Sequence, residues 1–155
     1  MKKCIIFILL ALFLIPSVAL GQKKYYVPEN IEVTIADGAA IPEEVLPAVK
    51  ENIKIYTADL SSWEKSSKPV NVLVKIIKIE EAHIASSFVF GAFSPSILTG
   101  EITIFDGDKK RIIPVTAKSR STVFTAFFGK TGMNQRLAVY FADAVIATIQ
   151  QPFTD

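Results

Sequence analysis

The stretch VNVLVKIIKIE, residues 70–80, decides the fold of this chain, because it is predicted to be a strand inside a sheet. It is rich in β-branched residues, which pack well on a pleated surface. Its alternate positions form two faces: Val70, Val72, Val74 and Ile76 on one, and Asn71, Leu73, Lys75, Ile77 and Ile79 on the other. Both faces are partly apolar, which favours a central strand over an edge strand.

A hairpin is predicted after the central strand. Residues 97–105, ILTGEITIF, and residues 111–120, RIIPVTAKSR, both read as strands, and they flank the dipeptide Asp106-Gly107. This dipeptide between two strands is a strong hairpin signal. Pro114 has no amide hydrogen to donate to a neighbouring strand, so the second strand of the hairpin is expected at an edge of the sheet.

A strand and a helix are predicted before the central strand. Residues 30–35, NIEVTI, alternate polar and apolar side chains, as a half-buried strand does. A first helix at about residues 43–60 is predicted from the helical spacing of Val45, Val49, Ile53, Tyr56 and Leu60. Pro47 leaves its start open, because proline either begins a helix or kinks it.

The last predicted element is a helix with a long apolar stripe. The stripe has the spacing of one helix face and contains Leu137, Tyr140, Phe141, Ala144, Val145, Thr148 and Ile149. Asn134 is the predicted N-cap, and Pro152 follows the end. Further apolar residues widen the stripe, so we expect this helix to be buried on more than one side, within its own domain or against another subunit.

The order of predicted elements is strand, helix, strand, strand, strand, helix. This order predicts a small α+β domain with an antiparallel-dominated sheet and both helices packed on one face. Residues 22–155 are expected to form this single domain, which is long enough to bury a sizeable core.

The first 21 residues have the pattern of a secretory signal peptide. Two lysines precede an unbroken apolar run, residues 5–15, and small side chains occupy positions 19 and 21. Cleavage is therefore expected between Gly21 and Gln22, which would place the mature chain in the periplasm or outside the cell. The alternative is an uncleaved membrane anchor, although the apolar run is shorter than the about 20 residues that span a bilayer.

Cysteine and charge exclude several classes of partner and site. Cys4 is the only cysteine and precedes the apolar run, so the mature chain is expected to have no lipid anchor, disulfide or thiolate nucleophile. The leader carries two of the 17 basic residues and none of the 15 acidic ones, so the mature chain is formally neutral. A neutral chain has no overall field to attract nucleic acid or an anionic membrane.

Two segments concentrate phenylalanine. One is SSFVFGAFSPS, residues 86–96, and the other is STVFTAFFGKTG, residues 121–132; together they contain Phe88, Phe90, Phe93, Phe124, Phe127 and Phe128. These rings are expected either to pack on one another as a satellite core or to form an exposed patch for a partner protein or the membrane interface. A third interpretation makes residues 88–93 the end of a longer strand with a bulge at Gly91.

Residues with catalytic or metal-binding chemistry are sparse. His83 is the only histidine, and with Ser86 or Ser87 and Glu81 it forms no recognisable hydrolase triad. One histidine and no mature cysteine argue against a zinc site, and no phosphate-binding or dinucleotide-binding motif occurs. We therefore expect no enzyme activity, metal or cofactor. The basic run Lys109, Lys110 and Arg111 is expected at the solvated end of the hairpin.

Residues 70–150 contain the segments VNVLVKIIKIEEA and GEITIFDGDKKRIIPVTAKS and a final helix ending in AVIATI. With these segments, this part of the chain resembles a group of small bacterial envelope proteins of unknown function, many of them lipoproteins. The resemblance implies a periplasmic or surface domain with an assembly or binding role, and it brings no catalytic residues. This chain differs in having no cysteine after its leader.

Three functions are compatible with these features. The first is a non-enzymatic envelope domain that binds a protein partner or self-associates, through the phenylalanine segments and the final helix. The second is a carrier of a small apolar ligand held between sheet and helices. The third and most remote is a hydrolase that uses His83.

Overall fold

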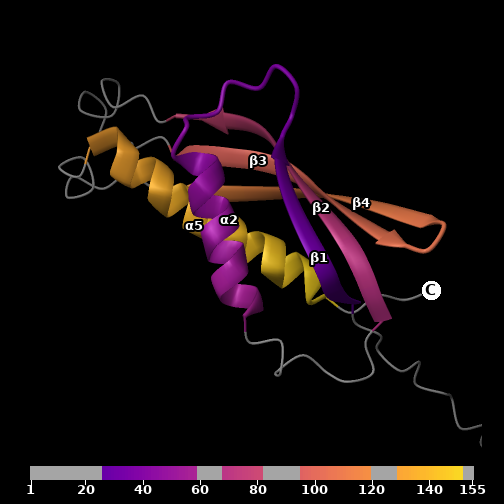
Figure 1. The fold of residues 1–155 in the computed structure, drawn as a ribbon. Helices are drawn as coiled ribbons and strands as arrows, with labels where there is room; N and C mark the ends of the chain where they lie inside the picture. Colours follow the sequence, from indigo (N-terminus) through magenta and orange to yellow (C-terminus); the bar gives the residue numbers. More distant parts are fainter. Residues whose placement is uncertain (1–25, 59–67, 82–94, 120–128, 152–155) are drawn as a thin grey trace, which may run out of the picture.

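The computed structural model describes residues 26–58, 68–81, 95–119 and 129–151. Along the chain the elements are β1 (Tyr26–Ile35), α2 (Val45–Thr57), β2 (Lys68–Glu80), β3 (Ser96–Asp106), β4 (Lys109–Ser119) and α5 (Gly129–Ile149). The four strands form one sheet, and α2 and α5 pack against each other on one of its faces (Figure 1). The predicted α+β class and element order are confirmed.

The strand order in the sheet is β1-β2-β3-β4, so β1 and β4 are the two edges. The β2–β3 and β3–β4 pairs are antiparallel, whereas β1 runs parallel to β2 because α2 carries the chain back across the sheet. The predictions of a central β2 and of an edge position for Pro114 are confirmed. Between β3 and β4 the chain reverses through Gly107, whose φ of 58° is one that glycine adopts without steric cost.

A β-bulge changes one part of the predicted face assignment in β2. Val70, Val72, Val74 and Ile76 are buried together on the helix-covered face, as predicted. Ile76 pairs with Gly100 while Lys78 pairs with Thr99, so one extra residue interrupts the ladder. Ile79 therefore pairs with buried Leu98 and packs against the core, whereas strict alternation wrongly placed it on the opposite face.

The first helix is shorter than predicted, and Pro47 lies in its first turn. It begins at Val45 and ends at Thr57, so Pro47 is the third helical residue. Amide hydrogens in the first turn of a helix have no intrahelical acceptor, so a proline there costs no hydrogen bond. Val45, Val49 and Ile53 form its buried face.

The last helix begins at Gly129, five residues before the predicted N-cap Asn134. Asn134 lies inside α5 and is buried, so its prediction as the N-cap is wrong. The buried stripe consists of Asn134, Leu137, Ala138, Phe141, Ala142, Val145, Ile146 and Ile149. It is rotated from the predicted stripe, and Tyr140 is 43% exposed because its position falls outside the new stripe. The apolar side of α5 is thus buried within its own domain, the first of the two predicted alternatives.

No helix among the described residues is both long enough and apolar enough to cross a lipid bilayer.

Phe141 fixes the position of α5 on the sheet. Its side chain is fully buried and lies against Gly100, in the middle of β3. A Cβ atom built on Gly100 would lie 2.6 Å from Cζ of Phe141 and 2.6 Å from the main-chain oxygen of Lys75. Glycine is therefore required at position 100 to leave room for the ring and for the close main-chain approach of β2.

Substituting Gly100→Ala is expected to lower the free energy of unfolding by about 1–3 kcal/mol, the range for overpacked cores. Chemical denaturation followed by circular dichroism measures this loss. The loss is expected to be smaller in a Phe141→Leu background, because leucine does not reach the added methyl group. An equal loss in both backgrounds would show that the ring is not the obstacle.

Candidate functional site

Most of the site residues predicted from the sequence lie outside the described residues. These are the six phenylalanines of the two phenylalanine-rich segments and His83. The basic run is described and is exposed at the β3–β4 hairpin, as predicted. Lys109, Lys110 and Arg111 follow one another in β4, so alternate side chains point to opposite faces and the three cations do not form one patch.

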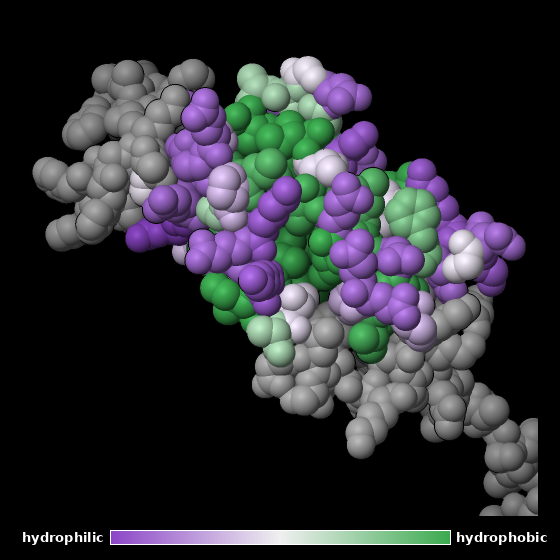
Figure 2. All heavy atoms as spheres, viewed as in Figure 1, coloured by the Kyte–Doolittle hydropathy of each residue, from purple (hydrophilic) through white to green (hydrophobic). Residues whose placement is uncertain are grey.

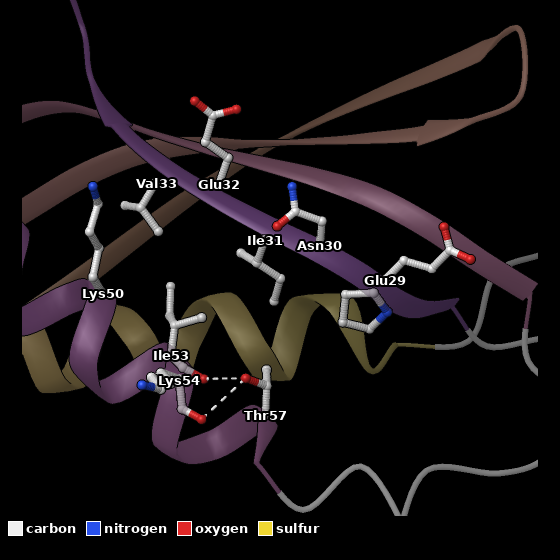
Figure 3. A pocket seen from close by; sticks show the side chains of 10 residues that line it. Glu29, Asn30, Ile31, Glu32, Val33, Lys50, Ile53, Lys54 and Thr57 are labelled. Carbon is white, nitrogen blue, oxygen red and sulfur yellow. Dashed lines mark hydrogen bonds between the residues drawn. The ribbon is translucent and has the colours of Figure 1, made fainter.

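A groove runs between α2 and the edge strand β1, with a volume of about 530 Å³. Figure 3 shows its two walls and the side chains between them. Its lining comes only from residues 28–33 of β1 and from α2, which contributes Lys50, Ile53, Lys54 and Thr57. The groove was not predicted from the sequence. It lies between a strand and a helix, and neither segment alone indicates that the two are separated in the fold.

The groove exists because α2 packs mainly on α5 and makes fewer contacts with β1. Two polar contacts accompany the apolar packing of the helices. Nδ2 of Asn134 donates a hydrogen bond to Oε1 of Glu44 over 2.9 Å. Nearer the other end, the hydroxyl of Tyr56 donates to the carboxylate of Asp143. These contacts hold both ends of α2 towards α5 and therefore away from the outer edge of β1.

The floor of the groove is apolar and its rims are charged. Ile31 and Val33 of β1 point towards α2, and Ile53 of α2 points towards β1 (Figure 3). Val33 and Ile53 are buried, while Ile31 is half-buried. Lys50 and Lys54 are exposed along the helix side. In the space-filling view, the hydrophobic floor lies between the hydrophilic side chains of the two elements (Figure 2).

The open edge of β1 borders this groove. Among the described residues, β1 pairs only with β2. The amide of Ala36 donates to the carbonyl oxygen of Ile76 over 2.8 Å, so the main-chain groups of Ala36 point towards β2. Main-chain groups alternate in direction along a strand. Those of Ile31, Val33 and Ile35 therefore point away from β2, towards the open edge.

A second hollow, of about 880 Å³, lies at the end of the sheet where residues 82–94 leave and rejoin it. Its lining includes Ile79, Glu81, Pro95 and Ile97. Glu81 and Pro95 flank residues 82–94 in the sequence, and both line this hollow. The predicted loop with Phe88, Phe90 and Phe93 itself lies outside the described residues.

The sheet face opposite the helices carries a smaller apolar patch. Leu73, Thr103 and Ile112 are cross-strand neighbours in one row, and Phe105 lies on the same face of β3. Phe105 and Ile112 are exposed. The β1–α2 groove adds a hollow and main-chain groups to its apolar side chains, so it is the better candidate for a binding site.

The groove supplies charges, apolar contacts and main-chain hydrogen-bonding groups. Its lining contains no Cys, His or Ser, and the hydroxyl of Thr57 already donates to the carbonyl oxygen of Ile53 over 2.8 Å. Within the described ranges, no three His, Cys, Asp or Glu residues gather closely enough to hold a metal ion. The lining thus combines apolar side chains with two lysines and two glutamates.

Neither the models of known protein families nor the curated proteins match this chain. Among solved structures, it is similar to a "putative lipoprotein from Caulobacter crescentus CB15" at 14% sequence identity. The similarity covers 77% of this chain and 86% of that chain, with a TM-score of 0.35. Similarity at this level does not identify a family or a function.

Substituting Asn134→Ala is expected to lower the free energy of unfolding by about 1–3 kcal/mol, because it removes a hydrogen bond to a charged group from a buried position. Asn134 is only 3% exposed. The matched control is Gln135→Ala, an exposed position one residue further along α5, where less than about 0.5 kcal/mol is expected. Equal effects in urea unfolding would contradict a stabilising role for the Asn134–Glu44 contact.

The stability of the protein is expected to fall above pH 10 in a way that depends on Tyr56. Its hydrogen bond to Asp143 raises the pKa of Tyr56 above the usual 10.0, with burial and the negative charge of Asp143 adding to the effect. Below pH 10 the Tyr56 phenol is protonated in both the folded and the unfolded chain, so its contribution to stability is complete there. As the pH rises further, the unfolded chain loses its proton first, and the contribution disappears through the raised pKa.

Urea unfolding between pH 8 and 11 tests this dependence. The wild-type protein is expected to lose stability more steeply with pH than Tyr56→Phe, which has no phenol to ionise at this position. The variant Asp143→Asn is expected to reduce the difference. Parallel curves for all three proteins would show that the contact does not affect folding.

Proposed function

We propose that this chain is an exported, non-catalytic domain of the bacterial envelope that binds a partner protein in the β1–α2 groove. Export is supported by the leader pattern, with cleavage between Gly21 and Gln22. The observation that carries the binding role is the apolar floor of the groove, placed beside an open strand edge.

The sequence had predicted partner binding by other surfaces, namely the final helix and the phenylalanine-rich segments. The final helix was expected to contribute apolar contacts to a partner, but Leu137, Phe141, Val145 and Ile149 are fully buried within the domain. The phenylalanine-rich segments stay a second proposed contact surface. The six phenylalanines themselves lie outside the described residues.

A protein segment suits the groove better than a small apolar ligand. The volume of about 530 Å³ falls within the usual range for small-molecule sites. However, four of the ten lining residues are charged, namely Glu29, Glu32, Lys50 and Lys54. The space between sheet and helices, where a carrier was expected to hold its ligand, is filled by side chains such as Val74, Leu98 and Phe141.

Site-specific photo-crosslinking in the producing cell tests the proposal. The photo-reactive residue p-benzoylphenylalanine replaces Lys54 on the groove wall or, as a control, Lys118 on the opposite edge of the sheet. We expect a covalent adduct with one partner protein from position 54 and none from position 118. Mass spectrometry of the adduct identifies the partner and reports whether the leader has been removed.

Binding of the purified partner is then measured by calorimetry. Ile31→Glu places a charge on the groove floor and is expected to weaken binding at least tenfold. Ile112→Glu makes the same change at an exposed strand position outside the groove, and it is expected to leave the affinity unchanged.

Three outcomes would overturn the proposal. They are the absence of any adduct at position 54, an adduct only with another copy of this chain, and a small molecule found in the groove by native mass spectrometry without a protein adduct.

A further inference from the structure

The two edges of the sheet differ in how well they are protected against another strand. β4 contains Pro114, and its exposed charged residues include Lys110 and Lys118. Proline and lysine are common means of preventing edge strands from pairing. In β1, protection is confined to one end, where Pro28 and the register shift before Asn30 disturb the strand.

The remaining part of β1, residues 31–35, is a regular strand with one charged residue, Glu32. Ile31 and Val33 present their side chains to the floor of the groove, and their main-chain groups point to the open edge. The same residues therefore offer both an apolar surface and main-chain groups that pair with no other described strand. A chain lying in the groove in extended conformation contacts both at once.

We infer that the groove takes an extended segment of a partner protein, which adds to the sheet as a fifth strand beside β1. This inference rests on the proposed function, because it specifies how the partner is held. Main-chain hydrogen bonds to Ile31, Val33 and Ile35 supply affinity, and alternate side chains supply specificity, as in other cases of strand addition.

The side chains of the groove specify the pattern of the segment. Side chains that point towards α2 meet Ile31, Val33 and Ile53 and are apolar. Lys50 reaches from α2 towards the Val33 end of β1 (Figure 3), so the inward-facing side chain at that end is acidic. The outward-facing side chain opposite Glu32 is basic or uncharged, because like charges on neighbouring strands repel.

The same charges disfavour a second copy of this chain as the occupant. A two-fold pairing of β1 with another β1 brings two α2 helices together at the edge. Lys50 and Lys54 of one copy would then face the same residues of the other copy across the groove. An acidic partner segment neutralises these lysines, whereas self-pairing places lysine against lysine on the helix side.

Selection from a peptide library tests the inference even while the partner is unidentified. The chain is produced with its own leader, purified and immobilised, and random twelve-residue peptides displayed on phage are selected against it. The enriched peptides are expected to alternate apolar residues over at least three positions and to carry an acidic residue in the same alternation.

The best enriched peptide is then synthesised and its affinity measured. The variant with both Lys50→Glu and Lys54→Glu is expected to bind it at least tenfold more weakly. Lys75→Glu and Lys118→Glu together make the same charge change at exposed strand positions outside the groove, and they are expected to have no effect.

Methylation of the peptide backbone distinguishes strand addition from other ways of filling the groove. Single N-methyl groups at successive positions are expected to abolish binding at every second residue only, because alternate amides pair with β1. The amides of Val33 and Ile35 are expected to exchange with solvent at least tenfold more slowly in the complex, as measured by NMR.

The inference is overturned if no peptide is enriched, if the enriched peptides lack the alternation, or if methylation has no two-residue period. An unchanged affinity of the double lysine variant would overturn the acidic preference. In each of these cases a crosslinked partner at position 54 would still support the proposed function, so failure of the two proposals can be distinguished.

Discussion

The packing of Phe141 against Gly100 is the contact on which the arrangement of the domain depends. An aromatic ring can approach the middle of β3 this closely only because no side chain projects from position 100. The ring places α5 over β3 and β4, and the buried stripe on both sides of Phe141 fills the space above the sheet. The large apolar area buried there is the main source of stability expected for a domain without disulfides.

The position of α5 in turn sets the position of α2. Because α2 packs mainly on α5, with polar contacts at Asn134 and Tyr56, it does not lie fully over the edge of the sheet. The same crossover that makes β1 parallel to β2 also makes β1 an edge strand. A helix held inward and a strand placed outward leave a groove between them, so the candidate site is a consequence of how the core is packed.

The strands of this fold were predictable because alternation of apolar side chains is a local property of the sequence. The run from Val70 to Ile76 identified the central strand, and Pro114 identified an edge. The bulge after Ile76 was not predictable, because an extra residue leaves no mark on composition and depends on pairing with β3. The prediction of Asn134 as a cap failed for a similar reason: its burial depends on Glu44, 90 positions earlier in the chain.

The candidate site was less predictable than the fold. The sequence drew attention to phenylalanines, which lie outside the described residues, and to a basic run whose side chains alternate between faces. No single segment contains the features of the groove, since Val33 belongs to a strand pattern and Ile53 to a helix pattern. Only the packing of α2 beside β1 brings them together and leaves the edge open.

The separation of charge from apolar surface in the groove determines how binding of the proposed partner would depend on ionic strength. Lys50 and Lys54 stand in solvent, where attraction extends about 10 Å at 0.1 M ionic strength and about 3 Å at 1 M. Val33 and Ile53 are shielded, and their contribution depends little on screening. For the proposed acidic segment, low ionic strength therefore favours fast association through long-range attraction. At high ionic strength its residence time depends mainly on the apolar floor.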